Sequence, residues 1–188
     1  MVDPKLLRDI NFFSDLNDDD LNVISKVLKE MDFKIGTTVF KEGEDGQSLY
    51  IIKRGEVKAC KSTPEGELLT LMLHKDGDIF GEMSFLDGRP RSATIVAISD
   101  TKAYMLEKND FEGLVDNHPR LIYKMLKNIV FSIHSIVRGS GRENTTSVTT
   151  TTLININRIS SIIITKGLER YNSSTGNKPL ISSCPTYN

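Results

Sequence analysis

The stretch from Phe80 to Thr94 reads FGEMSFLDGRPRSAT and lies among segments that are rich in Val, Ile and Thr. Residues 82–86 contain no turn former and are followed by Asp87-Gly88, so we expect one or two helical turns there. The first N–H groups of a helix have no acceptor within the helix, and together they favour an anion. Arg91 adds a guanidinium that can hold two phosphate oxygens at once.

Glu82 is the second polar group of this stretch. An ionised carboxylate only accepts hydrogen bonds, so it suits a sugar hydroxyl and not a phosphate. Taken singly, Arg91 fits a surface arginine paired with Glu82 or Asp87, and Glu82 fits a carboxylate that caps a helix. Their joint occurrence at nine-residue spacing, between Gly81 and Ala93, favours a binding site for a sugar phosphate.

The surrounding segments have the pattern of an antiparallel β domain. Short runs rich in Val, Ile, Tyr and Thr alternate with glycine-containing turns, at the roughly 8–12-residue spacing of a sandwich or jelly roll. The expected strands, all of which could face one barrel interior, are 37–41, 49–53, 56–61, 67–73, 93–98 and 102–106. The predicted fold is mainly β with flanking helices (α+β), an antiparallel β jelly roll with N-terminal helices and a C-terminal closing helix.

Helical spacing flanks the β region on both sides. Before it, an acidic run that suits the positive end of a helix precedes apolar residues at i, i+3 and i+4 spacing, namely Leu21, Ile24, Val27, Leu28 and Met31. After it, apolar residues follow Pro119 at helical spacing and predict a closing helix over 119–138. Four of them, Ile122, Met125, Ile129 and Ile133, suit either a homodimer contact between two such helices or packing on the roll.

The composition changes after Arg138. Residues 139–188 hold seventeen Ser or Thr and seven charged residues. Such a segment cannot bury enough apolar surface to offset the entropy lost on ordering. We therefore expect a folded domain over 1–138 and a Ser/Thr-rich, disordered tail over 139–188.

The whole chain has 188 residues, a formal net charge of −1 and 38% hydrophobic residues. It has no overall basic field to attract nucleic acid or anionic lipid, and no apolar run approaches the ~20 residues of a membrane helix. Two cysteines, Cys60 and Cys184, make no disulfide framework, and the N-terminus has no signal-peptide pattern. We expect a cytoplasmic protein without a nucleic-acid or membrane partner.

With its Gly-Glu start and its Arg-Ser-Ala-Thr close, the stretch Gly81–Thr94 resembles the phosphate-binding cassette of the cyclic nucleotide-binding domain family. The resemblance extends upstream through Gly43-Glu44, Leu49 to Ile52 and Gly55 to Val57, and it covers about residues 5–138. It implies an eight-stranded jelly roll flanked by helices, with one cyclic nucleotide inside the roll.

The resemblance also implies roles for individual residues. Gly81 and Glu82 would engage the ribose 2′-hydroxyl, Arg91 the exocyclic phosphate oxygens, and the backbone N–H groups of Ser84 and Ser92 the same phosphate. The full set of ligand-binding residues implied in this way is Gly81, Glu82, Met83, Ser84, Arg91, Ser92, Ala93, Leu71 and Tyr123.

The base is less closely specified. Leu71 would line the base pocket from its strand, and Tyr123 would either cap the base from the closing helix or pack as an ordinary tyrosine on the roll. A hydroxyl at Ser92 can meet the amino group of guanine, yet serine also occurs there in cyclic AMP binders. We predict cyclic AMP as the ligand, with cyclic GMP as the alternative, and no metal or other cofactor.

Two other classes of protein fit the sequence less well than a sensor does. A metal-dependent jelly-roll enzyme needs clustered imidazoles, whereas His74, His118 and His134 are far apart and form no H-x-H pair. A transcription factor of the cyclic AMP receptor type needs a basic recognition helix after the roll, and 139–188 offers no pair of capped amphipathic helices. We therefore predict a regulatory sensor, not an enzyme, that acts through an unknown protein effector.

Overall fold

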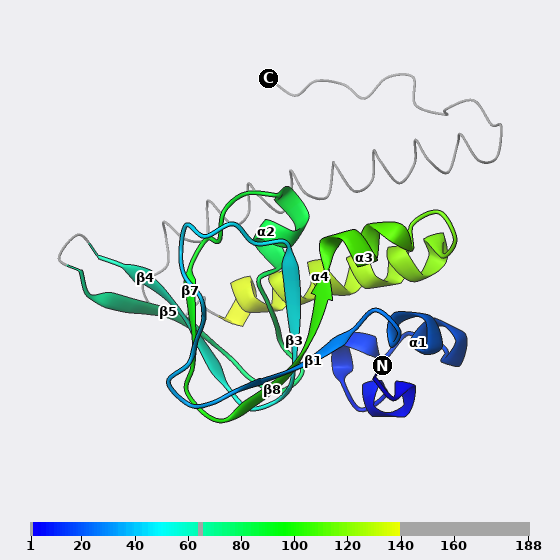
Figure 1. Ribbon diagram of the computed structural model, residues 1–188, viewed down its shortest axis with the longest axis horizontal. Coiled ribbons are helices and arrows are strands. Elements are labelled where there is room, and N and C mark those ends of the chain that lie inside the picture. The colour runs from blue at the N-terminus through cyan, green and yellow to red at the C-terminus, as the bar shows by residue number, and fades with distance from the viewer. Residues whose placement is uncertain (1, 64–65, 140–188) are drawn as a thin grey trace, which may run out of the picture. The chain divides into compact units, whose positions relative to one another are not determined.

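The computed structural model of the chain describes residues 2–63 and 66–139 (Figure 1). Residues Met1–Ile136 form one compact unit. The predictions about the tail and about Cys184 concern residues outside the described part, apart from Gly139. The boundary at residue 138 therefore stays a prediction.

Within residues 2–63 and 66–139, eight strands form two four-stranded antiparallel sheets, in the orders β1-β8-β3-β6 and β2-β7-β4-β5. Their bounds are β1 Lys29–Phe33, β2 Thr38–Phe40, β3 Ser48–Arg54, β4 Val57–Ser62, β5 Leu68–His74, β6 Ile79–Phe80, β7 Thr94–Ala97 and β8 Thr101–Glu107. Buried residues of both sheets, such as Tyr50, Phe80, Val57 and Ile95, share one apolar cluster. The predicted jelly roll is confirmed.

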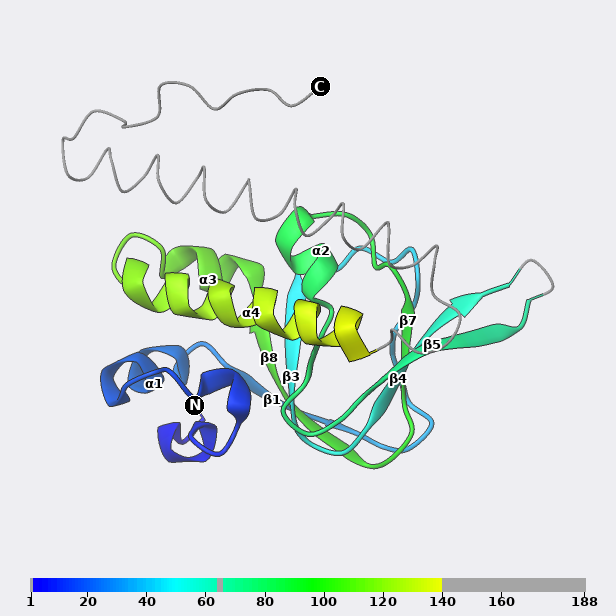
Figure 2. The same cartoon turned by 180° about the vertical axis from the view of Figure 1, so that it is seen from behind.

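Strand β3, inside the sheet β1-β8-β3-β6, is buried on both faces. Tyr50 and Ile52 belong to the cluster between the sheets, and their neighbours Leu49 and Ile51, which point to the opposite face, are also buried. The helices α3 (Lys108–Gly113) and α4 (Pro119–Gly139) lie along this sheet in both views (Figures 1 and 2). The sheet therefore separates the roll interior from a helical layer.

The N-terminal helices are two short 3₁₀ turns, Pro4–Leu7 and Asn11–Phe13, and α1, Asp18–Ile24. Polar contacts join this N-terminal segment to α4, which lies about a hundred residues later in the chain. Lys124 Nζ lies 2.6 Å from an Asp20 carboxylate oxygen and Lys127 Nζ lies 2.6 Å from one of Asp15, while Asn128 Nδ2 donates to Asp15 Oδ1 at 2.7 Å. Any movement of α4 must break these contacts or carry the N-terminal helices with it.

The predicted N-terminal helix is too long. Helix α1 begins as predicted, with a capping box between Asn17 and Asp20, but it ends at Ile24, and Met31 lies in β1. Met31 and Phe33 both pack against the roll interior, so this segment follows the two-residue period of a strand, which the helical spacing of Leu28 and Met31 concealed. Strand β6 was also missed, because two residues carry no periodicity.

Four apolar residues of α4 suited either a homodimer contact or packing on the roll. All four are buried: Ile122, Met125, Ile129 and Ile133. They pack within the chain and are not free for a second copy. A homodimer through this helix stays a prediction, and its contact would have to use exposed residues such as Tyr123 and Phe131. Within the described residues, no helix combines the length and hydropathy required to cross a membrane.

Candidate functional site

The short helix of the cassette forms where the sequence predicts it. Helix α2 spans Glu82–Asp87 between Gly81, with φ of 78°, and Gly88, with φ of 70°. A Cβ at Gly81 would lie 2.7 Å from Arg91 Nη1 and 3.0 Å from the carbonyl oxygen of Ser48. Glycine is therefore required at Gly81 both for its left-handed backbone and for the close approach of Arg91.

Arg91 is the central side chain of the site, and it is only 4% exposed. Its Nη1 donates to the carbonyl oxygens of Ser48, at 2.9 Å, and of Gly81, at 3.0 Å. Its Nη2 donates to Ser48 Oγ at 2.9 Å. These bonds join the start of β3 to the start of α2 through one guanidinium.

Two further residues fix the plane of this guanidinium. Arg91 Cζ lies 4.0 Å from the ring centroid of Phe40, which is a stabilising cation–π distance. A Cβ at Gly46 would lie 1.9 Å from Arg91 Nε, so the Gly46 backbone lies directly against the guanidinium. The backbone of Arg91 is held as well, because its N–H donates to Glu44 O at 2.8 Å and its carbonyl accepts from Gly43 N at 2.9 Å.

The guanidinium is buried without a counter-ion. In the described part of the chain, no carboxylate lies within ion-pair distance of it. Burial lowers the pKa of Arg91, against the opposing charges of Tyr50, Glu82 and Glu44. Nε is buried and has no hydrogen-bond partner. Of the five N–H donors of an arginine, Nη1 uses its two and Nη2 one, which leaves Nε–H and one Nη2 proton.

Glu82 lies at the first position of α2 and is partly buried. Burial raises the pKa of its carboxyl to about 7, against a hydrogen bond from its own backbone N–H and the charge of Arg91, which both lower it. Because this value is close to neutrality, small changes in pH or in bonding change its charge. A hydroxyl donor beside it would favour the ionised form.

The other predicted site residues lie in different surroundings. Ser84 is buried in α2, Met83 and Ala93 are partly buried, and Ser92 is exposed. Leu71 lies partly buried in β5, the edge strand of the second sheet.

Tyr123 is 70% exposed near the start of α4. This end of α4 is the one farther from α2 in both views (Figures 1 and 2). The structure thus brings Gly81 and Arg91 into contact but does not place Tyr123 at the cassette. Its role as a cap on the base stays a prediction.

Sequence reasoning missed Phe40, Gly46 and Ser48. All three reach Arg91 from more than 40 residues upstream in the chain, and none belongs to a motif with a spacing of its own. Of the three, only Gly46 could have been noticed in the sequence, because it is a glycine in a predicted turn. Even so, a turn glycine does not reveal which side chain packs against it.

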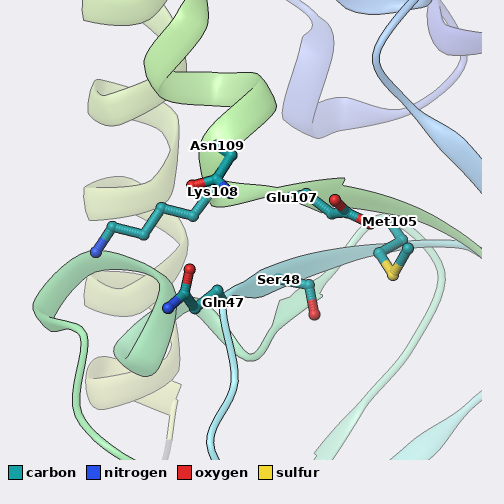
Figure 3. Close-up of a pocket in the computed structure, with 6 residues that line it drawn as sticks. All are labelled: Gln47, Ser48, Met105, Glu107, Lys108 and Asn109. Atoms are coloured by element: carbon teal, nitrogen blue, oxygen red, sulfur yellow. The ribbon is translucent and has the colours of Figure 1, made fainter.

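A small pocket of about 220 Å³ lies next to the residues that hold Arg91 (Figure 3). It lies where β3 begins and β8 ends, and its lining residues are Gln47, Ser48, Met105, Glu107, Lys108 and Asn109. Ser48 therefore lines this pocket and also contacts Arg91. None of the predicted ligand-binding residues lines it, so it is distinct from the cassette. Within the described residues, no group of three or more His, Cys, Asp or Glu side chains could hold a metal ion.

Comparison with known proteins indicates one family of domains. The family model described as "Cyclic nucleotide-binding domain" matches residues 30–118. A CRP-like cAMP-activated global transcriptional regulator of Mycobacterium tuberculosis is 29% identical over 123 residues, which are 65% of this chain and 55% of that protein. A cAMP-dependent protein kinase regulatory subunit of Yarrowia lipolytica is 34% identical over 109 residues, 58% of this chain and 28% of that protein.

A solved structure gives the same result. The crystal structure of a cyclic nucleotide-binding domain from Methylobacillus flagellatus is 28% identical to this chain, with a TM-score of 0.65, over 72% of this chain and 76% of that one. The chain spans about half the length of the mycobacterial regulator and just over a quarter of the Yarrowia subunit. Residues 30–118 of the chain therefore match the cyclic nucleotide-binding domain family.

Proposed function

We propose that the chain binds a cyclic nucleotide at the cassette, prefers cyclic AMP to cyclic GMP, and works as a regulatory sensor without catalytic activity. The observation that carries the proposal is the buried guanidinium of Arg91, which has no carboxylate partner among the described residues and has two unused N–H donors. A buried charge without a partner is unfavourable. A bound phosphate would supply both the missing negative charge and the missing acceptors.

The remaining groups of the cassette suit the rest of a cyclic nucleotide. Two phosphate oxygens would accept from Nε–H and the free Nη2 proton of Arg91, and from the backbone N–H groups of Ser84 and Ser92. The ionised carboxylate of Glu82, next to Gly81, would accept a hydrogen bond from the ribose 2′-hydroxyl. Met83, Ala93 and Leu71 would contact the nucleotide through apolar surface.

We propose that α4 is the moving part. For Tyr123 to reach the base, α4 must move, and the contacts of Lys124 and Lys127 with the N-terminal helices must break or move with it. A ligand shifts such an equilibrium only by its difference in affinity for the two conformations. The output would pass from α4 to a protein effector in the cytoplasm, and residues 1–138 would suffice for binding.

Isothermal titration calorimetry of the purified chain with cyclic AMP and with cyclic GMP tests the proposed function. We expect one site per chain and tighter binding of cyclic AMP. Tighter binding of cyclic GMP would reverse the assignment of the base but keep the phosphate site. Absence of binding to both would refute the proposed function.

The pH dependence of binding tests the role of Glu82. With the pKa of its carboxyl at about 7, the protonated form prevails below neutrality and must lose its proton to accept the 2′-hydroxyl as a carboxylate. We expect the affinity for cyclic AMP to rise by about tenfold from pH 6 to pH 8. Titrations at several pH values, in buffers of different ionisation enthalpy, would measure this change and the proton released.

Two controls accompany this measurement. Glu82→Gln keeps the size of the side chain and removes its titration, so its affinity should be independent of pH over this range. In the unmodified chain, 2′-deoxy cyclic AMP should show the same independence, because it has no hydroxyl for Glu82 to bind. Equal pH dependence for the deoxy and the normal ligand would mean that Glu82 does not contact the 2′-hydroxyl.

A further inference from the structure

Ser48 provides two of the three acceptors that hold the guanidinium of Arg91. We propose that Ser48 is a positioning residue, which fixes this guanidinium so that Nε–H and the remaining Nη2 proton are presented to an anionic group of the ligand. The proposal rests on the proposed function for the identity of that ligand. It assigns a role to a residue outside the predicted ligand-binding set.

The geometry around Ser48 supports a fixed orientation. Its carbonyl oxygen accepts from Nη1 and its Oγ from Nη2, both at 2.9 Å, so one residue holds both terminal nitrogens. Ser48 Oγ also lies 3.3 Å from the hydroxyl oxygen of Tyr50. The Tyr50 ring is stacked on Phe80, with centroids 4.9 Å apart and planes 3° apart. The hydroxyl of Ser48 is thus held between the guanidinium and the aromatic core of the roll.

The chemistry of the hydroxyl matters as much as its position. A hydroxyl accepts a hydrogen bond without carrying charge, so it orients the guanidinium and leaves its positive charge for a ligand. A carboxylate at position 48 would instead form an ion pair with Arg91 and compete with an incoming phosphate. The serine therefore allows a buried arginine to be both ordered and available.

Three substitutions of Ser48 separate these two effects. Ser48→Ala removes the Oγ acceptor of Nη2 and should weaken cyclic AMP binding by roughly 5- to 15-fold. Ser48→Thr keeps a hydroxyl and should bind cyclic AMP within about threefold of the unmodified chain. Ser48→Asp should weaken binding more than Ser48→Ala does, although it keeps an acceptor. Ser25→Ala is the control for loss of a serine hydroxyl away from the site, because Ser25 is buried in the N-terminal segment and its hydroxyl donates to the carbonyl oxygen of Asn22.

A cycle with Arg91→Lys shows whether Ser48 acts through Arg91. In the Arg91→Lys background, Ser48→Ala should change affinity by less than about twofold, because the positioned group is gone. An undiminished effect in that background, or a Ser48→Asp variant that binds as well as the unmodified chain, would overturn the proposal. Thermal melting of each variant controls for loss of the fold.

Side-chain NMR of the ligand-free chain supplies a readout that does not depend on cyclic nucleotides. The Arg91 guanidinium should give resolved Nη2 proton signals in the unmodified chain and in Ser48→Thr, and averaged Nη2 signals in Ser48→Ala, because Nη2 then loses its acceptor while Nη1 keeps the two backbone carbonyls. If the unmodified chain binds no cyclic nucleotide, the proposed function fails and these spectra alone decide the positioning of Arg91. Identical Nη signals in the unmodified chain and in Ser48→Ala would refute it.

Discussion

Replacing Arg91 with alanine is expected to weaken cyclic AMP binding by roughly 30- to 1,000-fold, which corresponds to about 2–4 kcal/mol. The substitution removes the only cation that the described structure buries in the cassette, together with the two N–H donors left for a phosphate. It also removes the donors to Ser48 and Gly81, so some loss of stability will accompany the loss of affinity. Calorimetric titration and thermal melting of the same samples measure the two effects.

Two companion variants separate charge from geometry. Arg91→Lys keeps the positive charge but cannot make a bidentate contact, so its affinity should lie between those of the unmodified chain and Arg91→Ala. Arg89→Ala is the matched control, because Arg89 lies two residues away, is exposed, and has its Nε 3.9 Å from a carboxylate oxygen of Asp87. If Arg91→Ala binds within threefold of the unmodified chain, or if Arg89→Ala is equally impaired, Arg91 is not the phosphate-binding residue.

Gly46→Ala is expected to have the second largest effect, although Gly46 is not one of the predicted ligand-binding residues. The new Cβ would lie 1.9 Å from Arg91 Nε, a distance that forces the guanidinium out of its place between Phe40 and the Ser48 acceptors. We expect a stability loss of about 1–3 kcal/mol from overpacking and a loss of affinity of at least about tenfold. Thermal melting and titration with cyclic AMP check the two parts.

Gly113→Ala provides the control for this substitution. Gly113 lies in α3, and a Cβ there would have no heavy atom within 4 Å, so the change adds a methyl group without a collision. Its stability and affinity should match those of the unmodified chain. If the Gly46→Ala variant instead binds and melts like the unmodified chain, Arg91 can leave its position at no cost. That result would contradict a guanidinium held in place by Phe40, Gly46 and Ser48.

The sequence predicted the β fold well and its borders less well. Six strands were expected within one or two residues of their observed bounds, because Val, Ile and Thr runs between glycine turns leave few alternatives. The N-terminal helix was extended over β1, since Leu28 and Met31 satisfy helical spacing while Met31 and Phe33 satisfy that of a strand. The segment is a strand because Lys29–Phe33 pairs with β8. Local spacing of residues cannot predict such pairing between strands that are distant in the chain.

The site divides in the same way. Gly81, Glu82 and Arg91 were found because they belong to one short segment that resembles a family motif. Ser48 and Gly46, which hold Arg91, come from another loop and strand, and only the three-dimensional structure brings them to the guanidinium. The resemblance also suggested a role for Tyr123, but a single conformation cannot test a contact that depends on the movement of α4.

The most direct test of the central claim is the NMR signal of the Arg91 Nε–H group, followed while cyclic AMP is added to the labelled full-length chain. The signal can be assigned by its absence from the spectrum of Arg91→Lys. In the ligand-free chain Nε has no acceptor, so a bound phosphate should shift its proton downfield and slow its exchange with water. Binding of cyclic AMP that leaves the Arg91 signal unchanged would contradict the account, because the phosphate would then lie elsewhere.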